Sequence, residues 1–335
     1  MDITGKNIMI TCGGGVGDII MFTPALKRLK EEYGVNITFA TPRNADILLG
    51  LPYVDDIAVI KRGAFLGRYR CIDKIFRQDA IIFSDWQPQL LLLARLLHIP
   101  YIAGIEREGH RLSKFLHKKI WHNVYSSEQY VAKTHAEMIE EALNIKLAGD
   151  MTDIEVALPN DEVVASVDYL LNDIGLAETQ EYVLLSPFTG LEQRNWNTIE
   201  AKRFVNFVNE YYHLPVVVLG TNEYKNSAEN ISEYNLVGRT SVVQMVELVR
   251  RSKVLVTPDS GPMHIAGALR KPVIALFSKD LPSRWAPRRN CWPVYLAYKC
   301  SPCSDDMARE CQYKVKCMND IKAEMVIELC KTALG

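Results

Sequence analysis

Short apolar runs alternate with longer amphipathic stretches along the whole chain, and this alternation predicts α/β structure. Asn7–Cys12 is an apolar run of strand length, and the stretch from Asp18 to Tyr33 carries its apolar residues at helical spacing. The same succession begins again at Tyr182–Ser186. Strands that alternate with helices through short loops predict parallel sheets with helices on both faces. Further strands are predicted at Val35–Ala40, Ile57–Ile60, Ala80–Ser84, Pro100–Gly104, Pro215–Leu219, Asn235–Val237, Val254–Thr257 and Val273–Phe277.

Two helix ends carry recognisable signals. Gly34 follows the predicted helix that ends at Tyr33, where a C-terminal glycine is common. Thr134, with Glu137 three residues later, has the pattern of a capping box and predicts a helix over Thr134–Asn144. These two signals predict where one helix ends and another begins without relying on the spacing of apolar residues.

The length of the chain predicts more than one domain. A chain of 335 residues is longer than one typical hydrophobic core. The stretch Ala148–Pro159 lacks helical period, so we expect the boundary near residues 150–178. The predicted division is an N-terminal domain 1–165, a C-terminal domain 166–319, and a closing helix within 320–335 that packs back toward the first domain.

Composition excludes several classes of protein. The chain has 39 basic and 40 acidic residues, which argues against a general nucleic-acid binder because such proteins need a basic excess. It has no apolar run long enough to span a bilayer. The start of the chain lacks the basic and apolar regions of a signal peptide, so we expect a cytoplasmic protein.

One turn in the C-terminal half has the character of an anion site. The strand Val254–Thr257 stops at the turn Pro258–Pro262, and a short helix is predicted over Met263–Leu269 before the next strand. A helix N-terminus presents N–H groups and a positive dipole end, which suits a diphosphate. Gly261 allows a ligand to approach the backbone closely. The alternative is an ordinary βαβ crossover with a polar turn.

The same turn carries a family resemblance. D-S-G-x-M-H-x-A-x-A-L, which starts at Asp259, is followed by P-V-I-A-L-F and resembles the donor-binding signature of glycosyltransferase family 9, the heptosyltransferases. The N-terminal segments Gly15–Asp18 and Thr23–Leu26 resemble that family's first motif. The resemblance implies a GT-B fold, in which two Rossmann-like, doubly wound α/β domains face each other across a cleft.

The resemblance also implies roles for individual residues. The donor-binding set would be Thr189, Arg194, Glu223, Asp259, Ser260, Gly261, Met263 and His264, with Glu223 near the nucleoside. The family usually has lysine where this chain has Arg194, and both side chains bind phosphate. Asp18 would be the general base, although an aspartate at this position is also a common helix cap. Gly15, Gly17, Arg62 and Arg68 would belong to the acceptor side.

The implied reaction is inverting, metal-independent transfer of a sugar from a nucleotide-sugar. By resemblance the donor is ADP-heptose-like, and the acceptor is a lipopolysaccharide-core sugar or another glycan, lipid-linked or protein hydroxyl. Three alternatives stay open. They are a nucleotide-sugar epimerase or hydrolase of the same fold, an autotransporter-type protein heptosyltransferase, and a non-catalytic binding or assembly protein. The sequence leaves the oligomeric state undetermined.

Four cysteines near the C-terminus form a separate signal. Cys300, Cys303, Cys311 and Cys317 have the spacing C-x₂-C-x₇-C-x₅-C. Four thiolates in a short tract predict a structural zinc or iron site, and some family 9 members have a similar C-terminal cysteine finger. Paired disulfides or four reduced thiols are the alternatives. We expect no cofactor for catalysis.

A basic stretch over residues 107–119 has two interpretations. It includes Arg111, Lys114, Lys118 and Lys119. Such a stretch suits an anionic acceptor or peripheral contact with the inner membrane surface, and it equally suits a solvated face of the protein.

Overall fold

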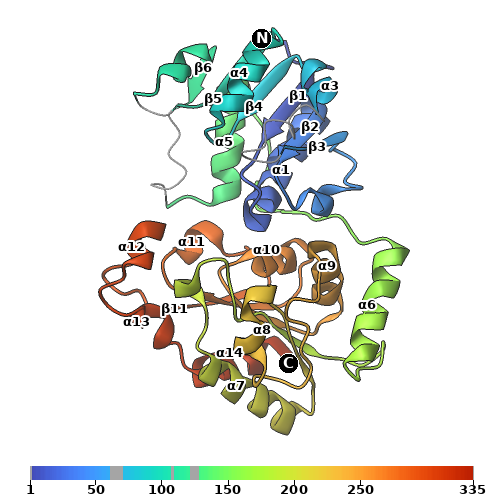
Figure 1. The fold of residues 1–335 in the computed structure, drawn as a ribbon, viewed down its shortest axis with the longest axis vertical. Helices are drawn as coiled ribbons and strands as arrows, with labels where there is room; N and C mark the ends of the chain where they lie inside the picture. Colours follow the sequence, from blue (N-terminus) through green and yellow to red (C-terminus); the bar gives the residue numbers. More distant parts are fainter. Residues whose placement is uncertain (1, 61–70, 107–108, 121–127, 335) are drawn as a thin grey trace. The chain divides into compact units, whose positions relative to one another are not determined.

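The computed structural model describes residues 2–60, 71–106, 109–120 and 128–334, and the chain divides into two compact units. Residues 1–157 form the first unit and residues 158–335 the second. In each unit a parallel sheet lies between helices (Figure 1). The predicted division after residue 165 falls inside helix α6 (Asp161–Asp173), all of which belongs to the second unit.

The sheet of the first unit has six parallel strands in the order β3-β2-β1-β4-β5-β6. Strand order reverses between β1 and β4, because β2 and β3 extend the sheet to one side and β5 and β6 to the other. The strands are β1 Asn7–Thr11, β2 Asn36–Thr41, β3 Asp56–Val59, β4 Ala80–Phe83, β5 Tyr101–Ile105 and β6 Lys118–Ile120, and the helices are α1 Val16–Tyr33, α3 Ile72–Phe76, α4 Pro88–Leu96 and α5 Val131–Leu143.

The sheet of the second unit has five parallel strands in the order β11-β10-β9-β7-β8, and here the order reverses between β7 and β9. Its strands are β7 Val183–Leu185, β8 Val216–Val218, β9 Leu255–Pro258, β10 Val273–Phe277 and β11 Cys291–Tyr295. Besides α6, its helices are α7 Thr198–Phe207, α8 Lys225–Ala228, α9 Val242–Arg251, α10 Gly261–Ala268, α11 Pro282–Trp285, α12 Asp305–Arg309, α13 Lys316–Asn319 and α14 Ala323–Leu334.

Helix ends follow local chemistry in one case and tertiary packing in another. Gly34 ends α1 in the left-handed conformation at φ 61°, and its N–H donates to the Lys30 carbonyl, as a C-terminal glycine should. Helix α5, in contrast, starts at Val131 rather than at Thr134. The Thr134 side chain is buried and its hydroxyl donates to the Tyr130 carbonyl, so it is not a cap. Burial of the first turn moves this helix start upstream of the capping signal.

Two edge strands are absent from the sequence-based assignment. Strand β6 has only three residues, and β11 contains Pro293, which is atypical of a strand. Each strand lies at the edge of its sheet, where one side needs no ladder partner. The predicted strand Asn235–Val237 is reduced to a single parallel bridge between Val218 and Asn235.

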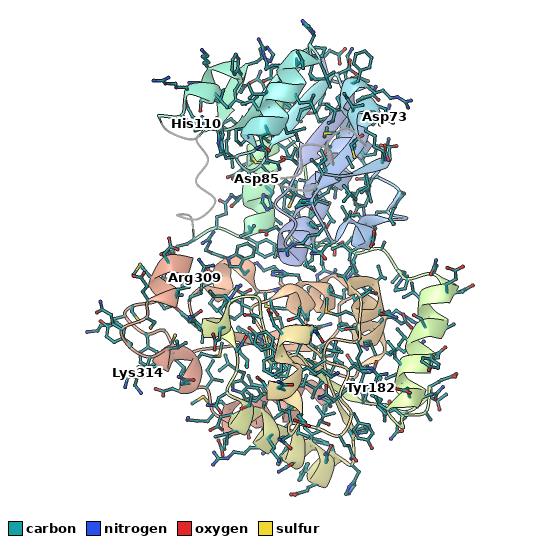
Figure 2. All side chains as sticks on the ribbon, in the orientation of Figure 1. Asp73, Asp85, His110, Tyr182, Arg309 and Lys314 are labelled. Carbon is teal, nitrogen blue, oxygen red and sulfur yellow. The ribbon has the colours of Figure 1, made fainter. Side chains whose placement is uncertain are left out.

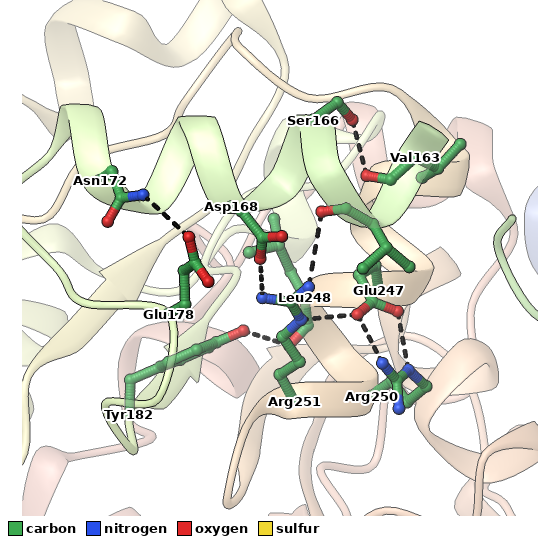
Figure 3. Close-up of polar contacts among 11 residues, drawn as sticks. Val163, Ser166, Asp168, Asn172, Glu178, Tyr182, Glu247, Leu248, Arg250 and Arg251 are labelled. Atoms are coloured by element: carbon green, nitrogen blue, oxygen red, sulfur yellow. Dashed lines mark hydrogen bonds and ion pairs between the residues drawn. The ribbon is translucent and has the colours of Figure 1, made fainter. Parts of the chain in front are cut away.

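Helix α6 is held to the second unit by a buried ionic network on α9 (Figure 3). Glu247 of α9 is 0% exposed and accepts hydrogen bonds from Arg250 at 2.6 and 2.7 Å and from Arg251 at 2.6 Å. Arg251 also pairs with Asp168 of α6. Burial raises the pKa of the Glu247 carboxyl, but the hydrogen bonds and charges of the two arginines outweigh burial, so the net pKa is lowered.

Helix α14 packs on α7, β10 and β11 within the second unit. Trp196 is buried and its Nε1 donates to the Ile321 carbonyl at 2.9 Å, which ties the segment before α14 to the start of α7. Within the described ranges, every helix is too short or too polar to cross a membrane.

We predict that Glu247→Ala destabilises the second unit by about 2 kcal/mol, because it removes the hydrogen bonds of both arginines to a buried carboxylate and leaves the largely buried Arg251 with Asp168 alone of its two carboxylate partners. Glu162→Ala, on the exposed first turn of α6, is the matched control and should change stability by less than about 0.5 kcal/mol. Denaturant unfolding measures both. Because the pKa of Glu247 is lowered on folding, its contribution is present above the ordinary carboxyl pKa and is lost as the pH falls through the lowered value. Equal stability of the two variants would contradict the proposed role.

Candidate functional site

The turn between β9 and α10 lies at the carboxyl end of the second sheet. Helix α10 begins at Gly261, two residues before the predicted start, with Ser260 as its N-terminal flanking residue. The Ser260 hydroxyl donates to the Pro258 carbonyl at 3.1 Å and lies 3.1 Å from Thr257 Oγ1. The Asp259 N–H donates to the Leu276 carbonyl of β10 at 3.0 Å. The turn is therefore fixed to two strands, and the unpaired N–H groups of the first turn of α10 lie at the carboxyl end of β9.

Arg194 and Asp259 meet across the position where strand order reverses. Arg194 follows β7, Asp259 follows β9, and Arg194 Nη1 lies 3.6 Å from Asp259 Oδ2. The Asp259 side chain is 7% exposed and the Arg194 side chain 25%. Open α/β sheets bind ligands at the carboxyl ends of strands at such a reversal. The contact holds a guanidinium beside the N-terminus of α10, where an anion is favoured.

His264 is a buried, neutral member of this cluster. Its ring is 3% exposed, with Nε2 3.9 Å from Asp259 Oδ1. Burial, supported by the charge of Arg194, lowers the pKa of His264 to about 3. At neutral pH the approach to Asp259 is therefore not an ion pair. The indole of Trp285 in α11 lies edge-on to the imidazole at 5.8 Å between ring centroids.

Two other predicted donor residues lie on neighbouring loops. The Thr189 hydroxyl donates to the Leu191 carbonyl at 2.7 Å and accepts from the Leu191 N–H at 3.1 Å, so it stabilises its own loop. The Tyr224 hydroxyl donates to the Thr189 carbonyl at 3.0 Å. Glu223 follows β8, is exposed, and accepts from Thr221 at 2.9 Å. The predicted set thus occupies the carboxyl ends of three strands, β7, β8 and β9.

In the first unit, Asp18 lies in the first turn of α1 and follows β1. A Cβ atom at Gly15 would be 2.4 Å from Asp18 Oδ2, so the carboxylate lies directly over Gly15 and would have to shift if this residue carried a side chain. Burial, followed by the charges of Asp18 and Asp85, raises the pKa of the Cys12 thiol. Gly17 is part of the same helical turn. The two predicted acceptor arginines, Arg62 and Arg68, fall outside the described residues.

All eight cysteines of the chain are free thiols, including the four near the C-terminus. Burial raises the pKa of Cys317, and the charges of Cys300, Cys303 and Cys311 raise it further. The Cys303 N–H donates to the Lys279 carbonyl at 2.9 Å, which joins this segment to the loop after β10. Over the residues that the structure describes, no three His, Cys, Asp or Glu side chains converge closely enough to hold a metal ion. The predicted metal site is therefore not confirmed.

Two residues of these regions are missed by sequence reasoning. Asp85 follows β4, and its carboxylate lies 3.4 Å from the Thr11 hydroxyl of β1. Trp285 follows β10, and its indole reaches His264 on α10. Neither residue belongs to a motif, so no local signal could have found it. Asp85 reaches its site because β1 and β4, which are distant in sequence, are neighbours in the sheet. Trp285 reaches His264 because α10 and α11 stand at either end of β10 in the chain.

Comparison with known proteins identifies the family. Residues 75–314 match the model described as glycosyltransferase family 9 (heptosyltransferase). This match covers more than half of the chain, so the chain belongs to glycosyltransferase family 9. Over 109 residues it is 32% identical to lipooligosaccharide heptosyltransferase 2 of Campylobacter jejuni. The matched stretch covers 32% of this chain and 33% of that protein. The matched stretches span less than half of the length of the first curated relatives.

Solved structures confirm the fold over the whole chain. A family 9 glycosyl transferase from Veillonella parvula has a TM-score of 0.82 at 17% identity, covering 100% of this chain and 98% of that one. ADP-heptose lipopolysaccharide heptosyltransferase II of E. coli has a TM-score of 0.78 at 18% identity, covering 98% of each chain. The iron-containing dodecameric glycosyltransferase TibC of E. coli has a TM-score of 0.61 at 13% identity, covering 99% of this chain and 80% of that one. The predicted GT-B fold is confirmed.

We predict that the α10 turn binds inorganic pyrophosphate and that Arg194 carries much of the affinity. Saturating pyrophosphate should raise the melting temperature by about 3 °C, since a ligand that binds only the folded state stabilises it. Arg194→Ala should remove most of this shift. Arg203→Ala, on α7 with a side chain 59% exposed, is the matched control and should keep it. A full shift in Arg194→Ala would show that the anion binds elsewhere.

Proposed function

We propose that this protein transfers heptose from ADP-heptose to a hydroxyl of a lipopolysaccharide-core or related glycan acceptor, with inversion at the anomeric carbon and without a catalytic metal. Family membership and the names of the relatives support the sugar and the donor. The observation that carries the proposal is the position of Arg194 beside the N-terminus of α10, where Asp259 holds it. The guanidinium and the N–H groups of the helix both suit a leaving diphosphate.

The second unit binds the donor in this proposal. The backbone N–H groups of Ser260 and Gly261 receive the diphosphate, and Arg194 neutralises the charge that develops on it. Met263 is buried behind them, and its N–H donates to the Ser260 carbonyl at 3.1 Å. Asp259 orients Arg194 and the sugar. Neutral His264 supports the turn, and Glu223 lies toward the nucleoside. Thr189 keeps the loop before Arg194 in place, consistent with its two hydrogen bonds to Leu191.

The first unit binds the acceptor and activates it. As the acceptor oxygen attacks C1 of the heptose, its proton passes to the Asp18 carboxylate and the bond from C1 to the diphosphate oxygen breaks, releasing ADP. The placement of Asp18 over Gly15 at the start of α1 supports this role. The proposed reaction requires a contribution from each unit, Asp18 from the first and the α10 turn with Arg194 from the second.

We predict that Asp18→Asn lowers heptose transfer by about 100-fold or more, because an amide cannot accept the proton. Binding of ADP, measured by calorimetry, should stay unchanged, since the donor site lies in the other unit. Asp46→Asn, at an exposed position of the first unit, is the matched control and should retain activity. Full turnover by Asp18→Asn would exclude Asp18 as the base.

We also propose a structural zinc or iron ion at Cys300, Cys303, Cys311 and Cys317. The four thiols lie within a short tract of the chain and belong to the ligand class that both metals accept, and the similar TibC structure is of an iron-containing protein. Loading would draw the sulfurs together from the positions described above. The metal would stiffen the segment that donates the Cys303 N–H to the loop after β10.

We predict that the purified protein holds close to one zinc or iron ion per chain by elemental analysis, and that Cys303→Ser lowers both the metal content and the melting temperature. Cys291→Ser is the control, because Cys291 lies in β11 outside the four-cysteine group. Metal-free protein with an unchanged melting temperature in Cys303→Ser would contradict the proposal.

Finally, we propose that the protein works in the cytoplasm and contacts the inner membrane surface through the basic face of its first unit. Leu92 and Leu96 of α4 are 43% and 72% exposed, and Lys118 and Lys119 of β6 are exposed on the same unit. Basic side chains with exposed leucines suit an anionic lipid surface.

We predict that the protein sediments with vesicles that contain anionic lipid and not with neutral vesicles. The double variant Leu92→Glu and Leu96→Glu should lose this binding, because it replaces the two exposed leucines of α4 with negative charges that anionic lipid repels. Leu158→Glu, at a 68% exposed position in the second unit, is the control. Equal sedimentation of all three proteins would contradict a contact through α4.

A further inference from the structure

The loop that follows β4 occupies the strand-order reversal of the first unit. It consists of residues 84–87 and lies next to the end of β1. Ser84 Oγ donates to the Thr11 carbonyl, which joins the two strand ends at the point where a ligand of an open α/β sheet is expected. The proposed base, Asp18, follows the same strand β1. The two positions belong to one sheet edge.

Asp85 is the charged residue of this loop (Figure 2). Its Oδ1 accepts from Gln87 Nε2 at 2.7 Å and lies 3.4 Å from Thr11 Oγ1, so the carboxylate is held between the loop and β1. The charges of Asp85 and Asp18 both act on the Cys12 thiol. Two carboxylates therefore approach the same strand end from different loops.

Trp86 adds an aromatic surface to the same loop. Its ring packs against a cluster of buried apolar side chains that includes Phe83 and Leu90. The centroid of the ring lies 4.7 Å from the centroid of the His110 ring. The indole Nε1 is buried and has no hydrogen-bond acceptor among the described residues. A buried donor of this kind normally has a partner, which a bound hydroxyl or ring oxygen would supply. A carboxylate, an amide and an aromatic ring in one loop are groups that recognise a sugar.

We propose that Asp85 positions the acceptor sugar by accepting a hydrogen bond from the hydroxyl next to the one that reacts at Asp18. This inference rests on the proposed function and extends it to the chemical class of the acceptor ring. Two carboxylates repel an anionic substituent, so the reacting ring is a neutral polyol, and charged groups of the acceptor lie away from this loop. Asp85 is a positioning residue, because the proton goes to Asp18.

The test is steady-state transfer of heptose from ADP-heptose to core oligosaccharide released from lipopolysaccharide. Asp85→Ala should raise the acceptor KM about tenfold, the loss expected for a hydrogen bond to a charged group, and Asp85→Asn should raise it less. The donor KM should stay within about twofold of the wild-type value. Asp73→Asn, an exposed α3 position drawn well apart from Asp85 in Figure 2, is the matched control and should behave as wild type.

A deoxy acceptor separates positioning from a structural role. For the wild type, the acceptor KM should rise about tenfold when the neighbouring hydroxyl is removed from the acceptor. For Asp85→Ala, the acceptor KM should be the same with and without that hydroxyl. Equal losses in both proteins, or an unchanged acceptor KM in Asp85→Ala, would overturn the inference. Failure of the proposed function would be visible separately, as absence of ADP-heptose-dependent transfer by the wild type.

Discussion

The contact between Arg194 and Asp259 depends on a constraint of parallel sheets. Strands β7 and β9 are neighbours, but their following loops lead to opposite sides because the strand order reverses between them. At the carboxyl edge between these strands, Arg194 from the loop after β7 lies 3.6 Å from Asp259, which follows β9 just before the start of α10. A guanidinium and a helix N-terminus at one place favour an anion more than either does alone.

The first unit also has a reversal of strand order, and carboxylates lie beside it. Its reversal lies between β1 and β4, and the residues that follow those strands include Asp18 and Asp85. The first unit therefore offers two carboxylates, which suit hydroxyl groups. The second offers Arg194, held by Asp259, and a helix N-terminus, which suit phosphate. Group transfer from a nucleotide-sugar needs both: a base for the acceptor and a stabiliser for the leaving diphosphate.

Sequence patterns predict those helices, strands and helix ends that depend on residues adjacent in the chain. They miss the features that depend on packing between distant segments. The end of α1 at Gly34 and the succession of β9, α10 and β10 follow from residues adjacent in the chain. Strand β11 escapes prediction because Pro293 is tolerated only through its edge position, and α5 starts earlier than its capping signal because its first turn is buried. Asp85 carries no local signal. Its place beside β1 comes from sheet order, which apolar periodicity does not encode.

The most direct test is a crystal structure with ADP-heptose bound. We expect the diphosphate within hydrogen-bonding distance of the backbone at Gly261 and of the Arg194 guanidinium, and Asp18 of the first unit beside the anomeric carbon. A diphosphate bound away from the α10 turn, or Asp18 on an outer surface remote from the sugar, would contradict this expectation.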